Sequence, residues 1–449
     1  IGTGSALTVT DTSDAADGKI VHTKKAGGVS MKGTLTLEKG TIGNGSATFA
    51  VVVNGGAFKM TGGKVTAGYC GVYVIEKETA AKIEILAGEI YLDPTVDGNY
   101  ATRAMDSNNA EVTLGSTTTA PKITAYYGVN VWKGKLTVED VDINATGFGI
   151  AGNGAGTYDD TGIIINGGTI DAAWGIYHPQ AGELTINGGT ITGTNTGVEI
   201  RAGKLTVTGG TIIGNGKPTE TAPNGNGTTS TGAGIAIAQH TTKKEIEVSI
   251  TGGTIKGYSA VYESNPQNNS ADDIAKVGMS ITGGTFETIN GGTSVIYSEN
   301  KTGFISKPET GNGPLFDRQP SNDYCALGYT TKKAEGSNLY GLTEVDAQAA
   351  YVAANGTIAY GTLADALTNA KSGTTITLLK NSEANGDFLY ISSDKTLDLN
   401  GKNLTVKGKL LAFGKVVDST DGAGLLKVTD MVGSQMPSDN PSLPVYDTE

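Results

Sequence analysis

The sequence predicts an all-β protein folded as a parallel β-helix, a solenoid in which successive turns of chain stack on one another. The first observation is a repeat: TGIIINGGTI, ELTINGGTI and KLTVTGGTI follow one another, with Gly167, Gly188 and Gly209 spaced 21 residues apart. The second is the alternation of apolar residues in each copy, which is typical of a strand, and the Gly-Gly corner that follows it. A fixed period of this length indicates turns that share one core, because one turn alone cannot bury its apolar face.

Composition agrees with strands and tight corners and excludes two classes of function. The chain has 449 residues, among them 67 Gly and 12 Pro, and its formal net charge is −12. This charge disfavours nucleic acid, because phosphate binding depends on Lys and Arg, and Arg occurs only at Arg103, Arg201 and Arg318. No apolar run approaches the roughly 20 residues that span a bilayer, so we expect no membrane insertion. Cys70 and Cys325 are too few for a disulfide framework.

The repeat can be followed over about residues 5–305, and we assign residues 1–305 to the first β-helix. Degenerate copies lie upstream at 32–42, 57–65, 82–90 and 134–143, where Glu139 and Asp140 replace the Gly-Gly corner, and further copies lie downstream at 248–255 and 279–286. Polar insertions rich in Gly, Asn and Pro interrupt the period at 214–231 and 264–276, and we expect them to be surface loops.

Each turn carries a further strand of its own, such as CGVYV at 70–74, YGVNVW at 127–132 and WGIYH at 174–178. Side chains alternate between the two faces of a strand. One set of positions should therefore point into the core: Val72, Val129, Ile150, Ile176, Val198, Ile235, Val261 and Ile296. The alternate positions should form an outward column, one residue above another.

The pattern lapses after residue 305, and residues 306–345, with Pro308, Pro314 and Pro320, are expected to be a connector. Residues 346–430 predict a second, short β-helix segment. Its first part contains a helix with Leu363, Ala366, Leu367 and Ala370 on one face, a capping pair of Thr362 with Asp365, and Gly373 as a stop. Such a helix can cover the open core at the end of a solenoid. Residues 431–449, with three Pro, are expected to be a linker or tail.

The ITGGTF and INGGTI turns, together with LADALTNAKSGTTITLL and KTLDLNGKNLTV, resemble the repeat regions of large cell-surface proteins from Gram-positive gut bacteria. Those regions are similar to the pectin-lyase-like superfamily of right-handed β-helices. The resemblance covers about residues 5–430. It implies a right-handed β-helix, but the superfamily includes lyases, hydrolases, tailspikes and adhesins, so the fold does not choose a chemistry.

The outward column supplies the candidate ligand-binding residues. Aromatic rings bury the apolar face of a sugar, although Tyr is also a favoured strand residue that packs against its neighbours. The candidates are Tyr73, Asn130, Trp132, Tyr177, Glu199, Arg201, Tyr262 and Tyr297, which we expect on one outer face. Trp174 has inward parity and is expected to stack in the core.

Catalytic candidates are weaker. Superfamily lyases use Asp-bound calcium with a basic residue, and its hydrolases use paired Asp, so the acidic pair Asp159 and Asp160 is the candidate here. An acidic pair in a polar loop is usually just solvated, and neither residue has an Arg beside it in the sequence. Calcium is thus a possible cofactor at most. His22, His178 and His240 show no metal-ligand spacing.

These observations favour a non-enzymatic, extracellular module of a bacterial surface protein, either an adhesin or a rigid spacer, with a host or dietary glycan or a surface protein as partner. A carbohydrate-active enzyme of the β-helix type is the alternative. The chain begins with Ile1, so we expect a processed protein or a piece of a longer one. ALTVTD at 6–11 matches LLKVTD at 425–430. Two interpretations of this match stand equally: residues 346–430 of one molecule stack head-to-tail on the first turn of the next, or the chain is a repeat unit cut at a boundary within a longer tandem protein.

Overall fold

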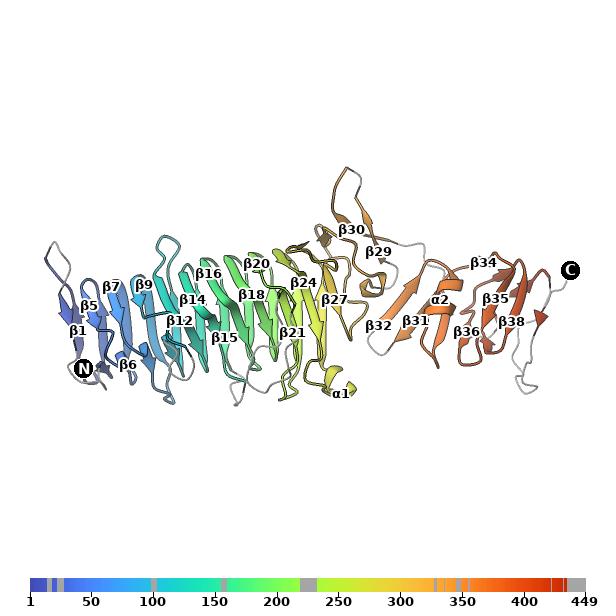
Figure 1. Cartoon of the computed structure of the whole chain (residues 1–449). Coiled ribbons are helices and arrows are strands. Elements are labelled where there is room, and N and C mark those ends of the chain that lie inside the picture. Colours follow the sequence, from blue (N-terminus) through green and yellow to red (C-terminus); the bar gives the residue numbers. More distant parts are fainter. Residues whose placement is uncertain are drawn as a thin grey trace. The chain divides into compact units, whose positions relative to one another are not determined.

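The computed structural model is all-β, and its parallel strands stack as the coils of a β-solenoid with about 15 turns in all (Figure 1). The structure describes residues 1–13, 18–21, 28–97, 103–154, 160–218, 232–326, 329–334, 336–344, 349–353, 356–420, 422–430 and 432–433. The chain divides into two compact units, which are described separately. The first unit comprises Ile1–Asn300 with Pro308–Gln319, and the second comprises Lys301–Lys307 with Pro320–Glu449.

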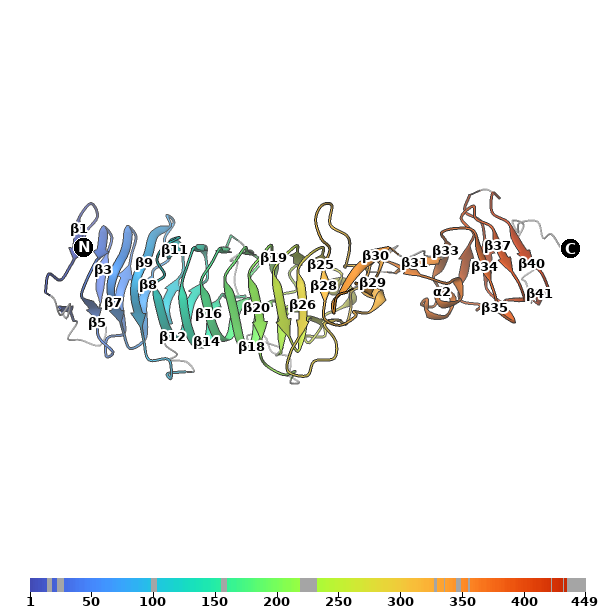
Figure 2. The ribbon, with the colours of Figure 1, turned by 90° about the horizontal axis from the view of Figure 1, so that it is seen from above.

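Each turn of the first unit contributes strands to three parallel columns, here called sheets a, b and c. Sheet a stacks β1 (Ala6–Val9), β4 (Thr34–Leu37), the starts of β7 (Ala57–Thr66) and β9 (Ala81–Tyr91), β11 (Ala110–Leu114), β13 (Gly134–Val138), β15 (Gly162–Ile165), β17 (Glu183–Ile186), β19 (Gly203–Val207), β22 (Ile246–Ile250) and β25 (Val277–Ile281). Figure 2 shows these strands following one another along the coil.

Sheet b follows the corner after sheet a in every turn. It contains β2 (Lys19–Ile20), β5 (Thr41–Gly43), the ends of β7 and β9, the first halves of β12 (Lys122–Val131), β14 (Asp142–Ala151), β16 (Thr169–His178) and β18 (Thr190–Ile200), then β20 (Thr211–Gly214), β23 (Thr254–Gly257), β26 (Thr285–Thr288) and β28 (Leu315–Phe316).

Sheet c closes each turn and carries the strands predicted from CGVYV and its relatives. It contains β3 (Val29–Met31), β6 (Phe49–Val53), β8 (Cys70–Val74), β10 (Arg103–Ser107), the second halves of β12, β14, β16 and β18, then β21 (Ala233–Ala238), β24 (Ser259–Ser264) and β27 (Ile296–Ser298). The short helix α1 (Ala271–Ile274) lies in the insertion predicted at 264–276.

Glycine makes the corner between sheets a and b. The second Gly of each pair has a positive φ, for example +78° at Gly189, which other residues adopt at a cost. The first Gly lies against the preceding turn, because a Cβ on Gly188 would lie 2.2 Å from the carbonyl oxygen of Asn166. The Gly-Gly motif is therefore required both for the bend and for the close stacking of turns.

The core is a set of stacked aliphatic side chains. All eight positions predicted to point inward from sheet c are fully buried. From sheet b, the residue after each corner threonine stacks in the same way, with Ile170, Ile191 and Ile212 in register and all fully buried. Each such side chain contributes roughly 1.5–3 kcal/mol by leaving water, so a long ladder stabilises the coil without large side chains.

The first unit extends beyond the boundary expected at residue 305. Leu315 and Phe316, inside the expected connector, form β28 and pair with Thr285 and Phe286 of β26. The rings of Phe286 and Phe316 stack with centroids 5.1 Å apart, and both are fully buried. The period had already lapsed there, so the sequence pattern alone missed this strand.

The second unit begins with irregular chain and two antiparallel hairpins. It contains the 3-10 helix η2 (Asn322–Tyr324), β29 (Tyr329–Lys333) paired with β30 (Tyr340–Glu344), and β31 (Ala349–Ala353) paired with β32 (Gly356–Tyr360). Three parallel columns follow: β33 (Thr375–Leu378), β36 (Thr396–Asp398) and β39 (Lys415–Val417); β34 (Ser382–Ala384), β37 (Leu404–Val406) and β40 (Leu426–Val428); β35 (Phe388–Ile391), β38 (Lys409–Ala412) and β41 (Val432–Gly433). The second solenoid segment is thus present.

The helix α2 (Leu363–Asn369) packs on the core of this second segment as predicted. Its apolar face is buried, with Leu363, Ala366, Leu367 and the following Ala370 in the same cluster as Ile376 and Leu389. The Thr362 side chain accepts a hydrogen bond from the backbone N–H of Asp365 at 3.1 Å, so the predicted N-cap is confirmed.

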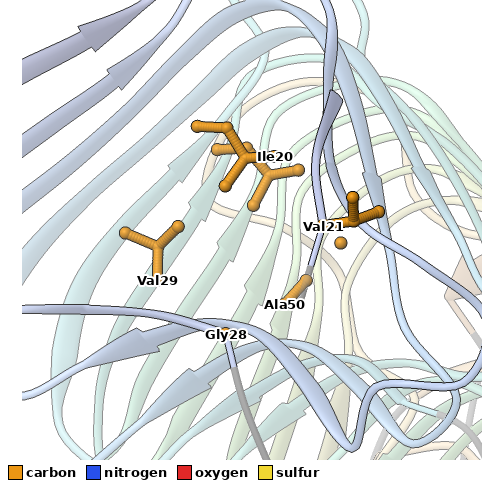
Figure 3. Close-up of a pocket in the computed structure, with 7 residues that line it drawn as sticks. Ile20, Val21, Gly28, Val29 and Ala50 are labelled. Carbon is orange, nitrogen blue, oxygen red and sulfur yellow. The ribbon is translucent and has the colours of Figure 1, made fainter. Parts of the chain in front are cut away.

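The apolar core of the first unit reaches the surface at the first turn. Leu7, Ile20 and Val21 are 40%, 38% and 52% exposed. Figure 3 shows Ile20, Val21 and Val29 around a small cavity of about 50 Å³, whose lining is Ile20, Val21, Gly28, Val29, Ile42, Gly43 and Ala50. Head-to-tail stacking of a second chain on this turn stays a prediction, which light scattering of the chain with and without residues 346–449 would test.

Candidate functional site

The outward column predicted from the sequence is in register. Strand pairing in sheet c aligns Tyr73, Asn130, Tyr177, Glu199, Tyr262 and Tyr297 at one position of successive turns. Asp106 lies in the column between Tyr73 and Asn130, in a turn whose strand, β10, the sequence pattern did not include. Ala151 and Ala236 occupy the column in two further turns. The alternation along each strand therefore placed these residues in the correct column.

Their exposure differs from the expectation of one open outer face. Tyr297 is 38% exposed, and Tyr73, Trp132 and Tyr262 are half-buried. The other four candidates are buried, with exposed fractions of 7% or less: Asn130, Tyr177, Glu199 and Arg201. Long polar side chains lie flat on the sheet and cover one another, as where Arg201 Nη1 donates to the Tyr177 hydroxyl at 3.3 Å. Burial raises the pKa of Tyr177, against the opposing effect of Arg201.

A second, unpredicted column of aromatic rings borders this one. Tyr127, Phe148 and Trp174 are in register and half-buried, and we call them the aromatic ladder. The rings of Tyr127 and Phe148 stack with centroids 5.3 Å apart, and those of Phe148 and Trp174 stack at the same separation. Trp174 is therefore in a stack, as expected, but this stack is half-exposed rather than in the core.

The backbone explains why inward parity misplaces Trp174. Each ladder residue precedes a glycine, and the pairing register shifts just before it, between Ala172 and Trp174 in β16. A Cβ on Gly175 would lie 2.4 Å from Ile191 Cγ2 and 2.5 Å from the carbonyl oxygen of Gly197, so only glycine fits. The chain turns at this point from sheet b to sheet c, and alternation cannot be counted through such an irregularity.

Arg103 continues the ladder position in the turn before Tyr127. Its guanidinium lies between two rings, 5.4 Å from the centroid of Tyr69 and 5.7 Å from that of Tyr127, within the range of cation–π attraction. Its Nη1 also forms an ion pair with Asp106 Oδ2 at 2.8 Å. We call Tyr69, Arg103, Asp106 and Tyr127 the Arg103 cluster.

Asp106 is the perturbed acid of this cluster. Burial raises the pKa of its carboxyl above the usual range, and the charge of Arg103 opposes but does not cancel this effect. The side chain of Asp106 is 5% exposed and that of Arg103 is 22% exposed, so the cluster presents the arginine to solvent. The sequence contained one usable signal: RAMDS stands one turn after CGVYV, with Ala104 where neighbouring turns have glycine.

The structure describes only one residue of the predicted catalytic pair. Asp160 is exposed, and Asp159 lies outside the described residues. Within the part of the chain that the structure describes, no group of three or more His, Cys, Asp or Glu side chains is placed to hold a metal ion. Cys70 and Cys325 are both buried free thiols, and burial raises the pKa of Cys325 to about 11. Such thiols are poor nucleophiles.

The fold defines the chain as a parallel β-solenoid protein. No family model, no curated protein and no solved structure matches it. The resemblance to pectin-lyase-like repeats therefore stays an expectation. None of the helices in the described ranges has the length and hydropathy of a membrane span.

Proposed function

We propose that the protein is a non-enzymatic, extracellular module of a bacterial surface protein that binds glycan along sheet c of its first unit. The observation that carries the proposal is the continuous row of rings and cation formed by the Arg103 cluster and the aromatic ladder. Stacked rings in a solenoid recur at the spacing of the turns, about 4.8 Å, so an extended polysaccharide can contact several of them at once. The rigid coil would also act as a spacer.

The chemistry of the row suits carbohydrate. Half-buried rings offer apolar area at a small cost in side-chain entropy, and the edges of these stacked rings can pack against the apolar faces of pyranose rings. Arg103 keeps donors beyond the one bound to Asp106, and these can bind sugar hydroxyl or carboxylate oxygens. At the other end of sheet c, Tyr262 and Tyr297 of the outward column stack with centroids 4.8 Å apart and form a separate pair of rings.

A carbohydrate-active enzyme remains the second candidate, and the raised pKa of Asp106 beside Arg103 favours it. Glycoside hydrolysis needs a second carboxylate about 5–9.5 Å from the first. Burial raises the pKa of Asp106, its charged neighbour Arg103 lowers it, and no carboxylate is among the groups that shift it. A polysaccharide-degradation assay run beside a glycan array separates the two: release of shortened products that Asp106→Asn abolishes would replace binding by catalysis.

The ladder is tested by Tyr127→Ala combined with Trp174→Ala in the full chain. We expect at least tenfold weaker binding to the best glycan of the array, about 1.4 kcal/mol, because two apolar contact surfaces are removed. Isothermal titration calorimetry measures it. Tyr91→Ala is the matched control, because Tyr91 is 40% exposed on sheet b, outside the row. Equal affinity of the double variant and the wild type would refute the proposed face.

Tyr177→Ala is unsuitable for this test, although Tyr177 is one of the candidates from the sequence. Tyr177 is buried, packs on Phe148 and accepts a hydrogen bond from Arg201. Its removal leaves a cavity and a buried donor, so a loss of binding could reflect unfolding. The exposed Tyr297 avoids this ambiguity.

A further inference from the structure

The second unit contains a cavity of about 420 Å³ beside the helix α2. Its lining comes from α2 (Ala364, Leu367, Thr368) and from β35 and the residues after it (Phe388, Leu389, Tyr390, Ser392, Lys395). Figure 2 shows α2 and β35 within the same small coil. The volume falls in the range of about 300–1,000 Å³ that ligand pockets span.

Three aromatic rings at or near this cavity are exposed to an unusual degree. Phe388 is 60% exposed, Tyr390 is 49% and Phe413 is 46%, and Phe388 is the most exposed large apolar residue in the described ranges. Alternation along β35 directs Leu389 and Ile391 into the core and leaves Phe388 and Tyr390 outside. Phe413 follows β38, the partner of β35, and its ring centroid lies 5.8 Å from that of Tyr390.

Core packing does not explain these rings, because the core beneath them is already filled. Leu389 and Ile391 belong to the buried cluster of the second unit together with Leu367 and Leu410. Their position on the surface does not explain them either. A polar residue at such an outward position would be solvated and would cost no core packing. Exposed rings that are grouped beside a cavity typically mark a binding surface.

The polar groups of the cavity match hydroxyl ligands. Lys395 Nζ donates to the carbonyl oxygen of Leu367, which uses one of its three protons. Ser392 Oγ donates to Asp394 Oδ1, and Thr368 Oγ1 donates to the carbonyl oxygen of Ala364, so both hydroxyls keep lone pairs. The site thus offers one cationic donor and two acceptors beside apolar rings.

We propose that this cavity binds a pyranose unit of a carbohydrate chain. The apolar face of the sugar lies on Tyr390 and Phe388, and its hydroxyl groups accept from Lys395 and donate to Ser392 and Thr368. A peptide strand is the alternative occupant. The separate acceptors on Ser392 and Thr368, together with the tilted rings of Tyr390 and Phe413, favour a sugar. This site is independent of the row on sheet c, since it uses residues of the second unit only.

The test uses the full chain on an array of neutral and uronic-acid oligosaccharides and compares wild type with Phe388→Ala combined with Tyr390→Ala. We expect the double variant to lose at least tenfold in signal on a subset of glycans. Tyr390→Phe should keep that signal, because it keeps the ring. Leu425→Ala, an exposed apolar change in the same unit that is outside the cavity lining, should also keep it.

The ladder variant, Tyr127→Ala with Trp174→Ala, separates this proposal from the proposed function. Signals that persist in the ladder variant but vanish with Phe388 and Tyr390 support the cavity alone, and the reverse pattern supports the row on sheet c alone. An array on which wild type and the Phe388/Tyr390 variant are indistinguishable would overturn the cavity proposal. The cavity proposal would also be overturned if Tyr390 were needed for binding to a peptide array but for no glycan signal.

Discussion

Gly175→Ala is expected to lower the unfolding free energy of the first unit by about 1–3 kcal/mol, the usual cost of an added methyl group in a packed core. The added Cβ would lie 2.4 Å from Ile191 Cγ2 and 2.5 Å from the carbonyl oxygen of Gly197. The carbonyl is backbone of the next turn, so relief requires the two turns to separate. Urea unfolding followed by far-UV circular dichroism measures the shift of the midpoint.

Gly162→Ala is the matched control for this change. Gly162 also lies in a strand of the solenoid, β15, but the nearest atom to its added Cβ is Lys135 Cγ at an ordinary 3.8 Å. We expect a change within about 0.5 kcal/mol of wild type, typical of a half-buried surface site without strain. If the two variants unfolded at the same denaturant concentration, close stacking at the glycine column would not be what stabilises the coil.

A single buried histidine is expected to make the protein about 3 kcal/mol less stable at pH 4 than at pH 7. His178 is fully buried, and burial lowers its pKa from 6.5 to about 4. Its Nε2 lies 3.1 Å from the carbonyl oxygen of Gly182, so Nε2 carries the proton and Nδ1 is bare in the folded state. Protonation would place a charge on a buried nitrogen that has no hydrogen-bond partner in the described structure.

The sign of this effect follows from proton uptake. Between pH 6.5 and 4 the unfolded chain binds a proton at this residue and the folded chain does not, so stability falls as the pH falls through that window. The full contribution is present above pH 6.5. Its size follows from the fall of the pKa from 6.5 to about 4, because each tenfold change in proton affinity is worth about 1.4 kcal/mol.

His178→Gln tests this assignment, because glutamine can donate to Gly182 without titrating. The difference in unfolding midpoint between wild type and variant should change steadily from pH 7 to pH 4, since carboxylates that titrate in both proteins cancel. A difference that is constant across this range would show that His178 does not carry the pH dependence.

Much of the fold was predictable because its causes are local. The 21-residue period, the Gly-Gly corner and the alternation of apolar residues each report on a few consecutive residues, and they placed the inward column from Val72 to Ile296 correctly. The helix α2 and its Thr362 cap followed from spacing of the same kind. The outward direction of Tyr73, Tyr262 and Tyr297 was also predictable. Stacked turns keep equivalent residues in register, so the alternation along one strand holds in the next.

The candidate site was only partly predictable, because it depends on contacts between turns. Alternation says which side of a strand a residue takes, but not whether neighbours cover it, and Glu199 and Arg201 have outward parity yet are fully buried. The register shift before Trp174 resets the parity that the sequence pattern assumed. Arg103 and Asp106 lie in a turn without the glycine motif, so no repeat marked them.

The amino-acid sequence by itself determined that this chain coils into stacked parallel turns, which aliphatic residues of sheet c point into the core, and where a helix covers the second segment. Only the tertiary structure decided that Arg103 lies between Tyr69 and Tyr127, and that Phe388 and Tyr390 remain uncovered beside α2. The physical reason is that the strand pattern arises from the backbone and its nearest neighbours, whereas exposure and ring stacking arise where residues distant in the sequence meet.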